Sequence, residues 1–257
     1  MKKEIVFNDD IEEMLLRLGG LFKQYGIDFY MVGAVARDIH LSVIDGYTVK
    51  RKTKDIDIAI MLSDEEQFYQ VREALLKDED FSVHKTESIK FFYKNEIELD
   101  LLPFGDIEDS YGVIQLHKPR LFTIDMPGFS TLFPNVEVKK VGNIELNVCP
   151  IEGLIILKLI ANDDNSSRTK DLVDIQHILD VYFDINQLEI WENYLDVMDL
   201  YDTTTTIFLQ LVSARIVGRK MKMLLVDAVH ISKRVSTILA KRVDPVWLAM
   251  YDGMYDS

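Results

Sequence analysis

The sequence predicts an α+β fold in which a β-sheet region flanked by helices is followed by an all-helical region. Short segments before residue 150 alternate apolar and polar residues, as in Asp55–Leu62, and this pattern is typical of a strand with one buried face. From residues 151–162 onward the alternation gives way to helical spacing. We therefore expect two domains, residues 1–149 and residues 150–257.

Capping and turn residues place the individual elements. Asn8 or Asp9 can cap a first helix that ends at Gly26, and Ser63 with Glu66 has the spacing of a capping box. We expect helices at residues 8–25, 34–41 and 63–77, and strands at residues 28–32, 55–62, 81–85, 89–93, 97–103, 120–124, 136–141 and 144–148. In the second domain, helices at residues 151–162 and 169–180 precede two or three more up to residue 250.

The composition narrows the class of protein. Among 257 residues there is a single cysteine, Cys149, which excludes an intramolecular disulfide framework and fits a reducing compartment. No apolar run approaches the roughly 20 residues that span a bilayer, and the N-terminus turns acidic before a signal-peptide core could form. The five histidines lack the paired spacing of a zinc site. We expect a cytoplasmic protein with no membrane partner.

The charge is unevenly distributed. Residues 211–243 contain eight Lys or Arg and one acid, Asp227, so that segment carries +7 and the remainder of the chain −21, for a total of −14. Such asymmetry favours a polyanionic partner. The alternative is a solvated helix face beside an acidic body.

Three aspartates form the chemical centre of the sequence. Asp55 and Asp57 share one face of a predicted strand, and at an effective dielectric constant of ~20 two carboxylates about 4 Å apart repel by roughly 4 kcal/mol. Asp100 stands in a later apolar strand, IELDLLP, that could pair beside the first. Mg²⁺ prefers such hard oxygen ligands, and two ions can hold a triphosphate and activate a hydroxyl. The alternative for the Asp-Ile-Asp pattern is a pair of solvent-facing edge positions.

Two further features suit a phosphate ligand. The turn at Gly33 opens onto a helix whose free N–H groups can receive phosphate oxygens. In that helix, Arg37 either contacts phosphate or pairs with Asp38. Lys158 lies in an apolar helix, LIILKLIA, where a lone charge is costly, so we expect a ligand phosphate or Asp171 as its partner.

These residues resemble the DNA polymerase beta-like nucleotidyltransferase superfamily. The matching stretches are VGAVARD (Val32–Asp38), DIDIAI (Asp55–Ile60) and ELDLLPFG (Glu98–Gly105). The resemblance implies a nucleotidyltransferase-type mixed sheet with Asp55, Asp57 and Asp100 as ligands of two Mg²⁺ ions. It also implies that Asp100 helps to activate the acceptor hydroxyl.

The resemblance narrows to the AbiEii-type toxin nucleotidyltransferases, over residues 28–180. Its further residues precede the Asp-Ile-Asp strand or lie on the helices after the sheet: Arg51, Thr53, Lys54, Lys158, Arg168, Lys170, Asp171 and Asp174. The nucleotide-binding residues that it implies are Gly33, Ala34, Arg37, Lys54, Lys158 and Asp171. Ala34 departs from the usual Gly-Gly or Gly-Ser pair, and the chain between Gly33 and Asp55 is longer than is common.

The implied activity is transfer of a nucleoside monophosphate from an NTP to a hydroxyl with release of pyrophosphate. The acceptor would be a tRNA end or a protein, with an antitoxin-like partner as a further expectation. The basic segment suits an RNA backbone, whereas the acidic remainder suits a small cationic acceptor, as in the aminoglycoside-modifying branch. Two alternatives stay open: a degenerate member that binds nucleotide or a partner without turnover, and an antitoxin-like nucleic-acid-binding protein.

Overall fold

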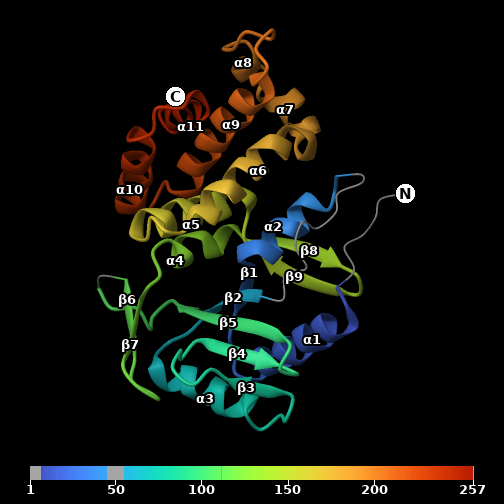
Figure 1. The fold of residues 1–257 in the computed structure, drawn as a ribbon, viewed down its shortest axis with the longest axis vertical. Coiled ribbons are helices and arrows are strands. Elements are labelled where there is room, and N and C mark those ends of the chain that lie inside the picture. The colour runs from blue at the N-terminus through green and yellow to red at the C-terminus, as the bar shows by residue number, and fades with distance from the viewer. Residues whose placement is uncertain (1–6, 45–54, 111, 257) are drawn as a thin grey trace. The chain divides into compact units, whose positions relative to one another are not determined.

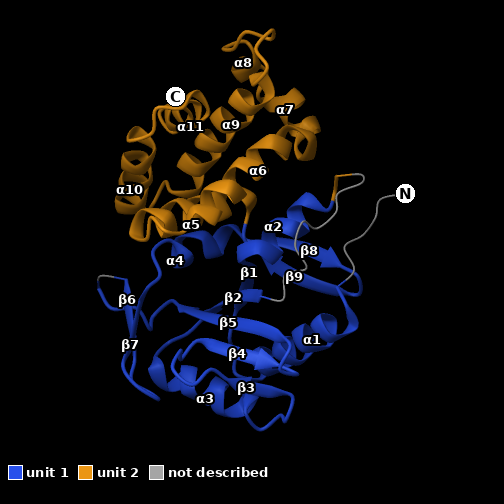
Figure 2. Cartoon of the chain, viewed as in Figure 1, with its two compact units in different colours: residues 1–42, 46–149 blue, residues 43–45, 150–257 orange. Residues whose placement is uncertain are grey.

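The computed structural model describes residues 7–44, 55–110 and 112–256. Over these ranges the chain forms two compact units (Figures 1 and 2). The first contains the described residues up to 42 and from 55 to 149, and the second contains residues 43–44 and 150–256. A mixed sheet with helices is followed by helices alone, so the predicted fold class is confirmed.

The first unit is built on a seven-stranded mixed sheet in the order β3-β4-β5-β2-β1-β9-β8. Its strands are β1 (Phe29–Val32), β2 (Asp55–Met61), β3 (Phe81–Val83), β4 (Lys90–Tyr93), β5 (Ile97–Phe104), β8 (Glu137–Val141) and β9 (Ile144–Val148). The β2–β5 and β1–β9 pairs are parallel, and the other neighbours are antiparallel. A separate hairpin joins β6 (Val113–Leu116) to β7 (Phe122–Asp125), and the sequence analysis had not anticipated β6.

Helices α1 (Asp9–Gln24) and α3 (Glu65–Leu75) pack on one face of this sheet (Figure 1). Ile56, Ile58 and Ile60 of β2 point to this face and are at most 1% exposed. Phe22 of α1 packs its ring 5.0 Å from that of Phe29 at the start of β1. The alternation of the sequence therefore sorts apolar side chains to this helix-covered face.

The opposite face carries an aromatic cluster where β5 ends at Phe104. There Tyr30 of β1 packs against Phe104 of β5 and against Phe129 and Phe133, which begin helix α4 (Phe129–Leu132) and the 3₁₀ turn η1 (Phe133–Asn135). The Tyr30 hydroxyl donates a hydrogen bond to the Phe129 carbonyl at 2.9 Å. The other end, which carries the polar residues of β2, β4 and β5, is hereafter called the open face.

Asp64 is the N-cap of α3, since its carboxylate accepts the N–H of Gln67 at 2.8 Å. Gln67, rather than the expected Glu66, reaches back toward the helix start, where its Oε1 accepts the N–H of Ser63 at 2.9 Å. A carboxylate such as that of Asp64 is a stronger acceptor for the N–H groups at a helix N-terminus than a hydroxyl is. With Asp64 as the N-cap, the residue three positions later is Gln67 and not Glu66.

The second unit consists of helices alone. They are α5 (Ile151–Asp164), α6 (Thr169–Ile185), α7 (Gln187–Asn193), α8 (Leu195–Met198), α9 (Phe208–Leu224), α10 (Val229–Ala240) and α11 (Pro245–Gly253). Five helices follow α6 within residues 187–253, so the expectation of two or three was too low. Breaks at Asn186 and Tyr194 produce the short helices α7 and α8, and Asp244 with Pro245 starts α11.

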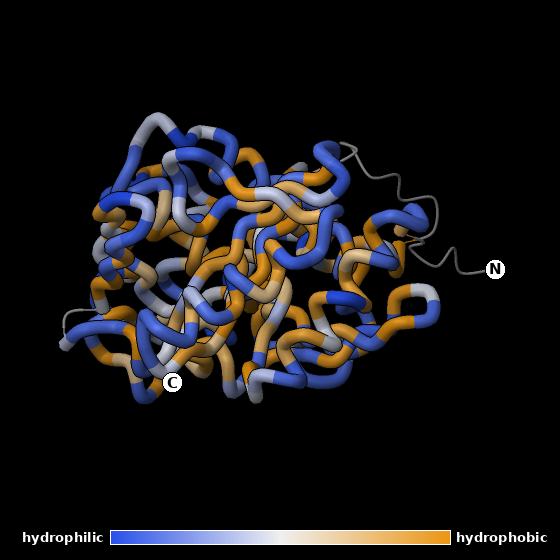
Figure 3. Tube along the Cα trace, turned by 90° about the horizontal axis from the view of Figure 1, so that it is seen from below, coloured by the Kyte–Doolittle hydropathy of each residue, from blue (hydrophilic) through white to orange (hydrophobic). Residues whose placement is uncertain are grey.

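Polar and apolar stretches alternate along the whole chain at short intervals (Figure 3). Within the described ranges, every helix is too short or too polar to cross a membrane.

Helices α9 and α11 cross with their backbones in direct contact. A Cβ on Gly218 would lie 2.1 Å from the Met250 carbonyl oxygen, and a Cβ on Gly253 would lie 2.1 Å from that of Arg215. Backbone atoms cannot move aside as a side chain can, so these two glycines fix the spacing of the two helices.

Replacing Gly218 by alanine is expected to lower the free energy of unfolding of the second unit by about 3 kcal/mol, because the helices must separate. The matched control is Gly20→Ala in α1, where the added Cβ meets nothing within 4 Å. The control should be neutral or stabilising by about 0.5–1 kcal/mol. Urea unfolding followed by circular dichroism measures both, and equal midpoints for the two variants would refute the close crossing.

Candidate active site

Asp57 and Asp100 lie side by side on the open face. Strands β2 and β5 are parallel, and their register places Asp57 directly opposite Asp100. Both carboxylates point to the same face because the register pairs residues of the same pleat. The structure thus brings together two of the three aspartates that the sequence singles out.

The backbone at Gly33 lies directly against the Asp57 carboxylate. Val32, the last residue of β1, pairs with Asp57, so the chain turns at Gly33 immediately over that carboxylate. Gly33 has φ of +66°, and a Cβ there would lie 2.0 Å from Asp57 Oδ2. Only glycine satisfies both the left-handed backbone and the close approach.

Asp100 is the more strongly perturbed carboxyl. Its Oδ1 is buried and has no hydrogen-bond partner in the described part of the chain. Burial raises the pKa of Asp100 to about 6; Lys90 opposes the rise and the neighbouring Asp57 adds to it. This pKa lies close to neutral pH, which is what a general base requires.

Lys90 is a site residue that sequence reasoning missed. It lies opposite Asp100 on β4, with its Nζ 3.8 Å from Asp100 Oδ1 and 2.9 Å from Glu98 Oε2. The hydrogen bond to Glu98 is the main cause that raises the pKa of Lys90. The signal was present, because the turn at residues 94–96 joins β4 to β5 and sets this register.

Asp55 starts β2, two residues before Asp57 on the same face, and is exposed. It lies opposite Glu98 of β5. No group of three or more His, Cys, Asp or Glu in the described ranges is close enough to hold a metal ion as it stands. Two features nevertheless fit a divalent cation at Asp57 and Asp100: the buried carboxylate oxygen without a hydrogen bond, and the glycine that leaves room beside its neighbour.

Helix α2 (Gly33–Leu41) begins at this glycine. Its N-cap residue, Val32, provides no side-chain hydrogen bond to the first turn. The first N–H groups of a helix are those that can receive the oxygens of a phosphate. Arg37 is 5% exposed and donates from Nε to Asp38 Oδ1 at 2.9 Å, which is one of its two predicted contacts. The phosphate contact stays a prediction.

Lys158 and Asp171, both in the second unit, meet as predicted. Lys158 Nζ lies 3.3 Å from Asp171 Oδ1 and 2.8 Å from Asp174 Oδ2. Arg168 donates from Nε to the other oxygen of Asp171 at 2.7 Å. Two cations and two carboxylates therefore balance one another between α5 and α6. Lys54, together with Arg51 and Thr53, lies outside the described residues.

The basic segment of residues 211–243 is largely neutralised within its own unit. The ion pairs are Arg215 with Asp252 and Asp256, Arg219 with Asp196 and Asp256, Lys220 with Glu152 and Glu189, Arg234 with Asp163 and Asp164, and Lys241 with Asp163. Five of the eight bases are therefore paired with carboxylates of their own unit, so much of the segment's charge is not available to an external anion. This pairing weakens the argument that the segment binds RNA.

A family model described as the nucleotidyl transferase AbiEii toxin of a type IV toxin–antitoxin system matches residues 19–255. No curated protein sequence matches the chain.

Three solved structures show a distant likeness. The lincosamide adenylyltransferase LnuA bound to lincomycin is 17% identical, with TM-score 0.36, covering 59% of this chain and 85% of that one. The antibiotic-resistance factor ANT(2'')-Ia is 11% identical, with TM-score 0.42, covering 91% and 100%. An antigenic nucleotidyltransferase-like protein from Paracoccidioides brasiliensis is 13% identical, with TM-score 0.42, covering 90% and 94%. Likenesses this weak transfer no substrate to the present chain.

Asp100→Asn is expected to stabilise the metal-free protein at pH 8 by about 1–2 kcal/mol, with partial exposure screening some of the shift. The folded-state pKa of about 6 exceeds the ordinary aspartate value of 3.8, so the folded state binds the proton more tightly than the unfolded state. Stability contributed by this group is therefore present below about pH 4 and lost as pH rises to about 6. The asparagine variant should accordingly gain nothing at pH 4.

Urea unfolding in EDTA at the two pH values measures this difference. Asp106→Asn, at an exposed position of the same unit, is the control and should show no pH-dependent gain. A gain of equal size for Asp100→Asn at both pH values would contradict the raised pKa.

Proposed function

Since this chain belongs to the AbiEii nucleotidyltransferase toxin family, we propose that it moves a nucleoside monophosphate from an NTP to a hydroxyl group in a reaction that requires divalent metal. The observation that carries the proposal is the alignment of Asp57 and Asp100 on adjacent parallel strands, with Gly33 closing over Asp57. Two carboxylates in this arrangement repel each other unless a cation or proton joins them.

In the proposed step, the acceptor oxygen attacks the α-phosphorus of the NTP. A new oxygen–phosphorus bond forms, the bond from the α-phosphorus to the bridging oxygen breaks, and pyrophosphate leaves with the bonding electron pair. The hydroxyl proton would pass to Asp100 as the general base. Lys90, held by Glu98, keeps a positive charge next to this carboxyl.

Asp57 and Asp100 would hold Mg²⁺, with Asp55 joining them as the third ligand on the same face. When bound, the metal supplies charge neutralisation for the triphosphate and activation of the acceptor oxygen. The backbone N–H groups of Gly33 and Ala34, at the start of α2, would bind phosphate oxygens. A side-chain hydroxyl at residue 34 is not required for this contact, so Ala34 is compatible with activity.

In the second unit, Lys158 and Asp171 are proposed to contact the nucleotide. Lys158 already has two carboxylate partners in Asp171 and Asp174, so it would bind a phosphate only by exchanging one of them. Arg168 would then retain Asp171 and limit the cost of that exchange. Lys54 is also proposed to bind the nucleotide, because it directly precedes Asp55 in the sequence.

The acceptor is proposed to be a macromolecular hydroxyl, on RNA or protein, and an antitoxin is proposed as the regulatory partner. A non-catalytic nucleotide binder is the competing function. The two differ in one observable, because a binder saturates with NTP and Mg²⁺ without releasing pyrophosphate.

Asp57→Asn is expected to lower pyrophosphate release and label transfer from α-labelled NTP by at least about 10³-fold, because a metal ligand contributes several kcal/mol to the transition state. Total RNA and cell protein serve as acceptors. The control is Asp106→Asn, which should transfer label at the wild-type rate. Nucleotidyl transfer that persists unchanged in Asp57→Asn would refute the proposed centre.

Gly33→Ala is expected to lower activity by about 100-fold, because the added Cβ displaces the Asp57 carboxylate from its position. Gly26→Ala provides a matched control: Gly26 has φ of +64° but nothing lies within 4 Å of its added Cβ. Both variants should lose about 1–2 kcal/mol of stability from left-handed strain. If both lost activity equally, strain alone would explain the effect and the carboxylate contact would not.

A further inference from the structure

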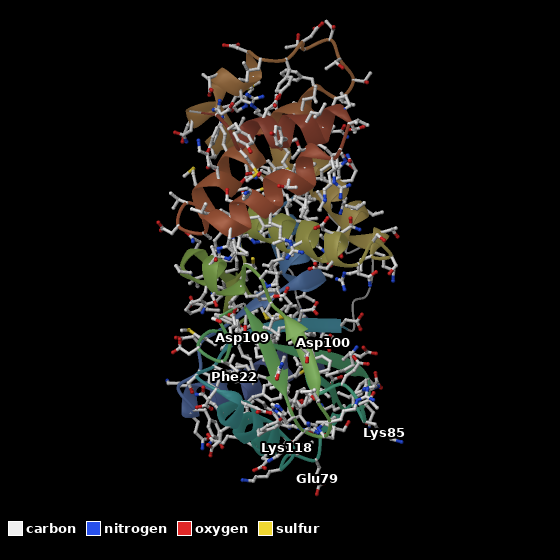
Figure 4. All side chains as sticks on the ribbon, turned by 90° about the vertical axis from the view of Figure 1, so that its left-hand side faces the viewer. Phe22, Glu79, Lys85, Asp100, Asp109 and Lys118 are labelled. Carbon is white, nitrogen blue, oxygen red and sulfur yellow. The ribbon has the colours of Figure 1, made fainter. Side chains whose placement is uncertain are left out.

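Lys90 stands among the carboxylates of the open face. Its partner in the β4–β5 register is Asp100, so the two side chains project from the same face of the sheet. The Lys90 Nζ lies 3.8 Å from Asp100 Oδ1, the buried oxygen that has no hydrogen bond in the described part of the chain. A positive charge of the protein itself therefore lies next to a proposed metal ligand (Asp100 is labelled in Figure 4).

Two contacts of different kinds hold this ammonium. Glu98 Oε2 accepts a hydrogen bond from Lys90 Nζ at 2.9 Å, whereas the 3.8 Å contact with Asp100 is an ion pair too long for a hydrogen bond. Glu98 and Asp100 lie on the same face of β5, because side chains alternate along a strand. Lys90 is thus fixed by Glu98, and it can lose its attraction to Asp100 without giving up its hydrogen bond.

The surroundings make the charge of Lys90 effective. Its side chain is 22% exposed and that of Asp100 is 28% exposed, so water screens their interaction less than it would at a fully exposed position. A metal ion bound at Asp100 Oδ1 would have this ammonium as its neighbour, and two positive charges repel. Lys90 therefore balances the charge of Asp100 in the metal-free protein and opposes the entry of a metal ion.

We propose that the Lys90 ammonium, fixed by Glu98, competes with the divalent cation for Asp100, so that the site binds free metal weakly and binds it well only together with the nucleotide. The negative charges of a triphosphate offset the repulsion between Lys90 and the metal. Each ligand then raises the affinity for the other by the same factor. The inference rests on the proposed function, to which it adds that metal binding depends on nucleotide binding.

The test measures the affinity of the full chain for Mn²⁺ by electron paramagnetic resonance, which detects the unbound ion. Titrations are run without nucleotide and with the α,β-methylene analogues of ATP, GTP, CTP and UTP, in which carbon replaces the bridging oxygen of the bond that would break. Mn²⁺ held by each analogue alone is measured separately and subtracted. The variants are Lys90→Met, which removes the charge, and Lys90→Arg, which keeps it.

Lys85→Met is the matched control. It makes the same charge change in the same unit at an exposed position (Lys85 is labelled in Figure 4). Because water and salt screen an exposed charge, Lys85→Met should bind Mn²⁺ as the wild type does, with and without the analogues. Circular dichroism establishes that each variant is folded.

Lys90→Met should bind Mn²⁺ alone about tenfold more tightly than the wild type, a factor within the usual range of coupling between two ligands. The analogue should tighten Mn²⁺ binding about tenfold less in Lys90→Met than in the wild type, because the repulsion that it offsets is gone. Lys90→Arg should retain the wild-type affinities. If the Lys90–Glu98 pair served structure alone, Lys90→Met would lower the melting temperature and leave the Mn²⁺ affinity unchanged.

The proposal is overturned if Lys90→Met binds Mn²⁺ no more tightly than the wild type, if Lys85→Met gains the same affinity, or if no analogue tightens Mn²⁺ binding to the wild type. Label transfer is measured separately. Transfer by the wild type together with an unchanged Mn²⁺ affinity in Lys90→Met would remove this inference alone. The expected gain in affinity without any label transfer would support the inference and count against the proposed function.

Discussion

The parallel pairing of β2 with β5 is the constraint on which the site depends. Its register sets Asp57 against Asp100, and the same pleat sends Ile56, Ile58 and Ile60 into the opposite, helix-covered face. A slip of one residue would bury the carboxylates and expose the isoleucines. The hydrophobic core therefore holds two mutually repelling groups together. The raised pKa of Asp100 comes mainly from its burial, and the charge of Asp57 adds to it.

The distribution of charge depends on a second constraint. A lysine or arginine that is already paired with a carboxylate is not available to bind an external anion. In the second unit, Arg215, Arg219 and Arg234 are each bound by aspartates of neighbouring helices. In the first unit, Lys90 is likewise held by Glu98. Charge counted along the sequence does not show which acids the fold brings next to each base.

Sequence reasoning succeeded for features that follow from the periodicity of side chains along an element or from the spacing of residues. Strand alternation located β2 and β5, and an apolar helix with one lysine required an acid, which proved to be Asp171 together with Asp174. It failed where register or loop packing decides. Lys90 reaches Asp100 only through the β4–β5 register, and the β6–β7 hairpin has too short and mixed a pattern to stand out. At the start of α3, Ser63 and Asp64 compete for the N-cap position, and Asp64 occupies it.

The close approach of Gly33 to Asp57 also has a consequence for how this chain can change by mutation. Any side chain at residue 33 collides with the Asp57 carboxylate. Residue 33 therefore cannot drift to another amino acid while Asp57 keeps its place, so this position accepts glycine alone for as long as the site is used.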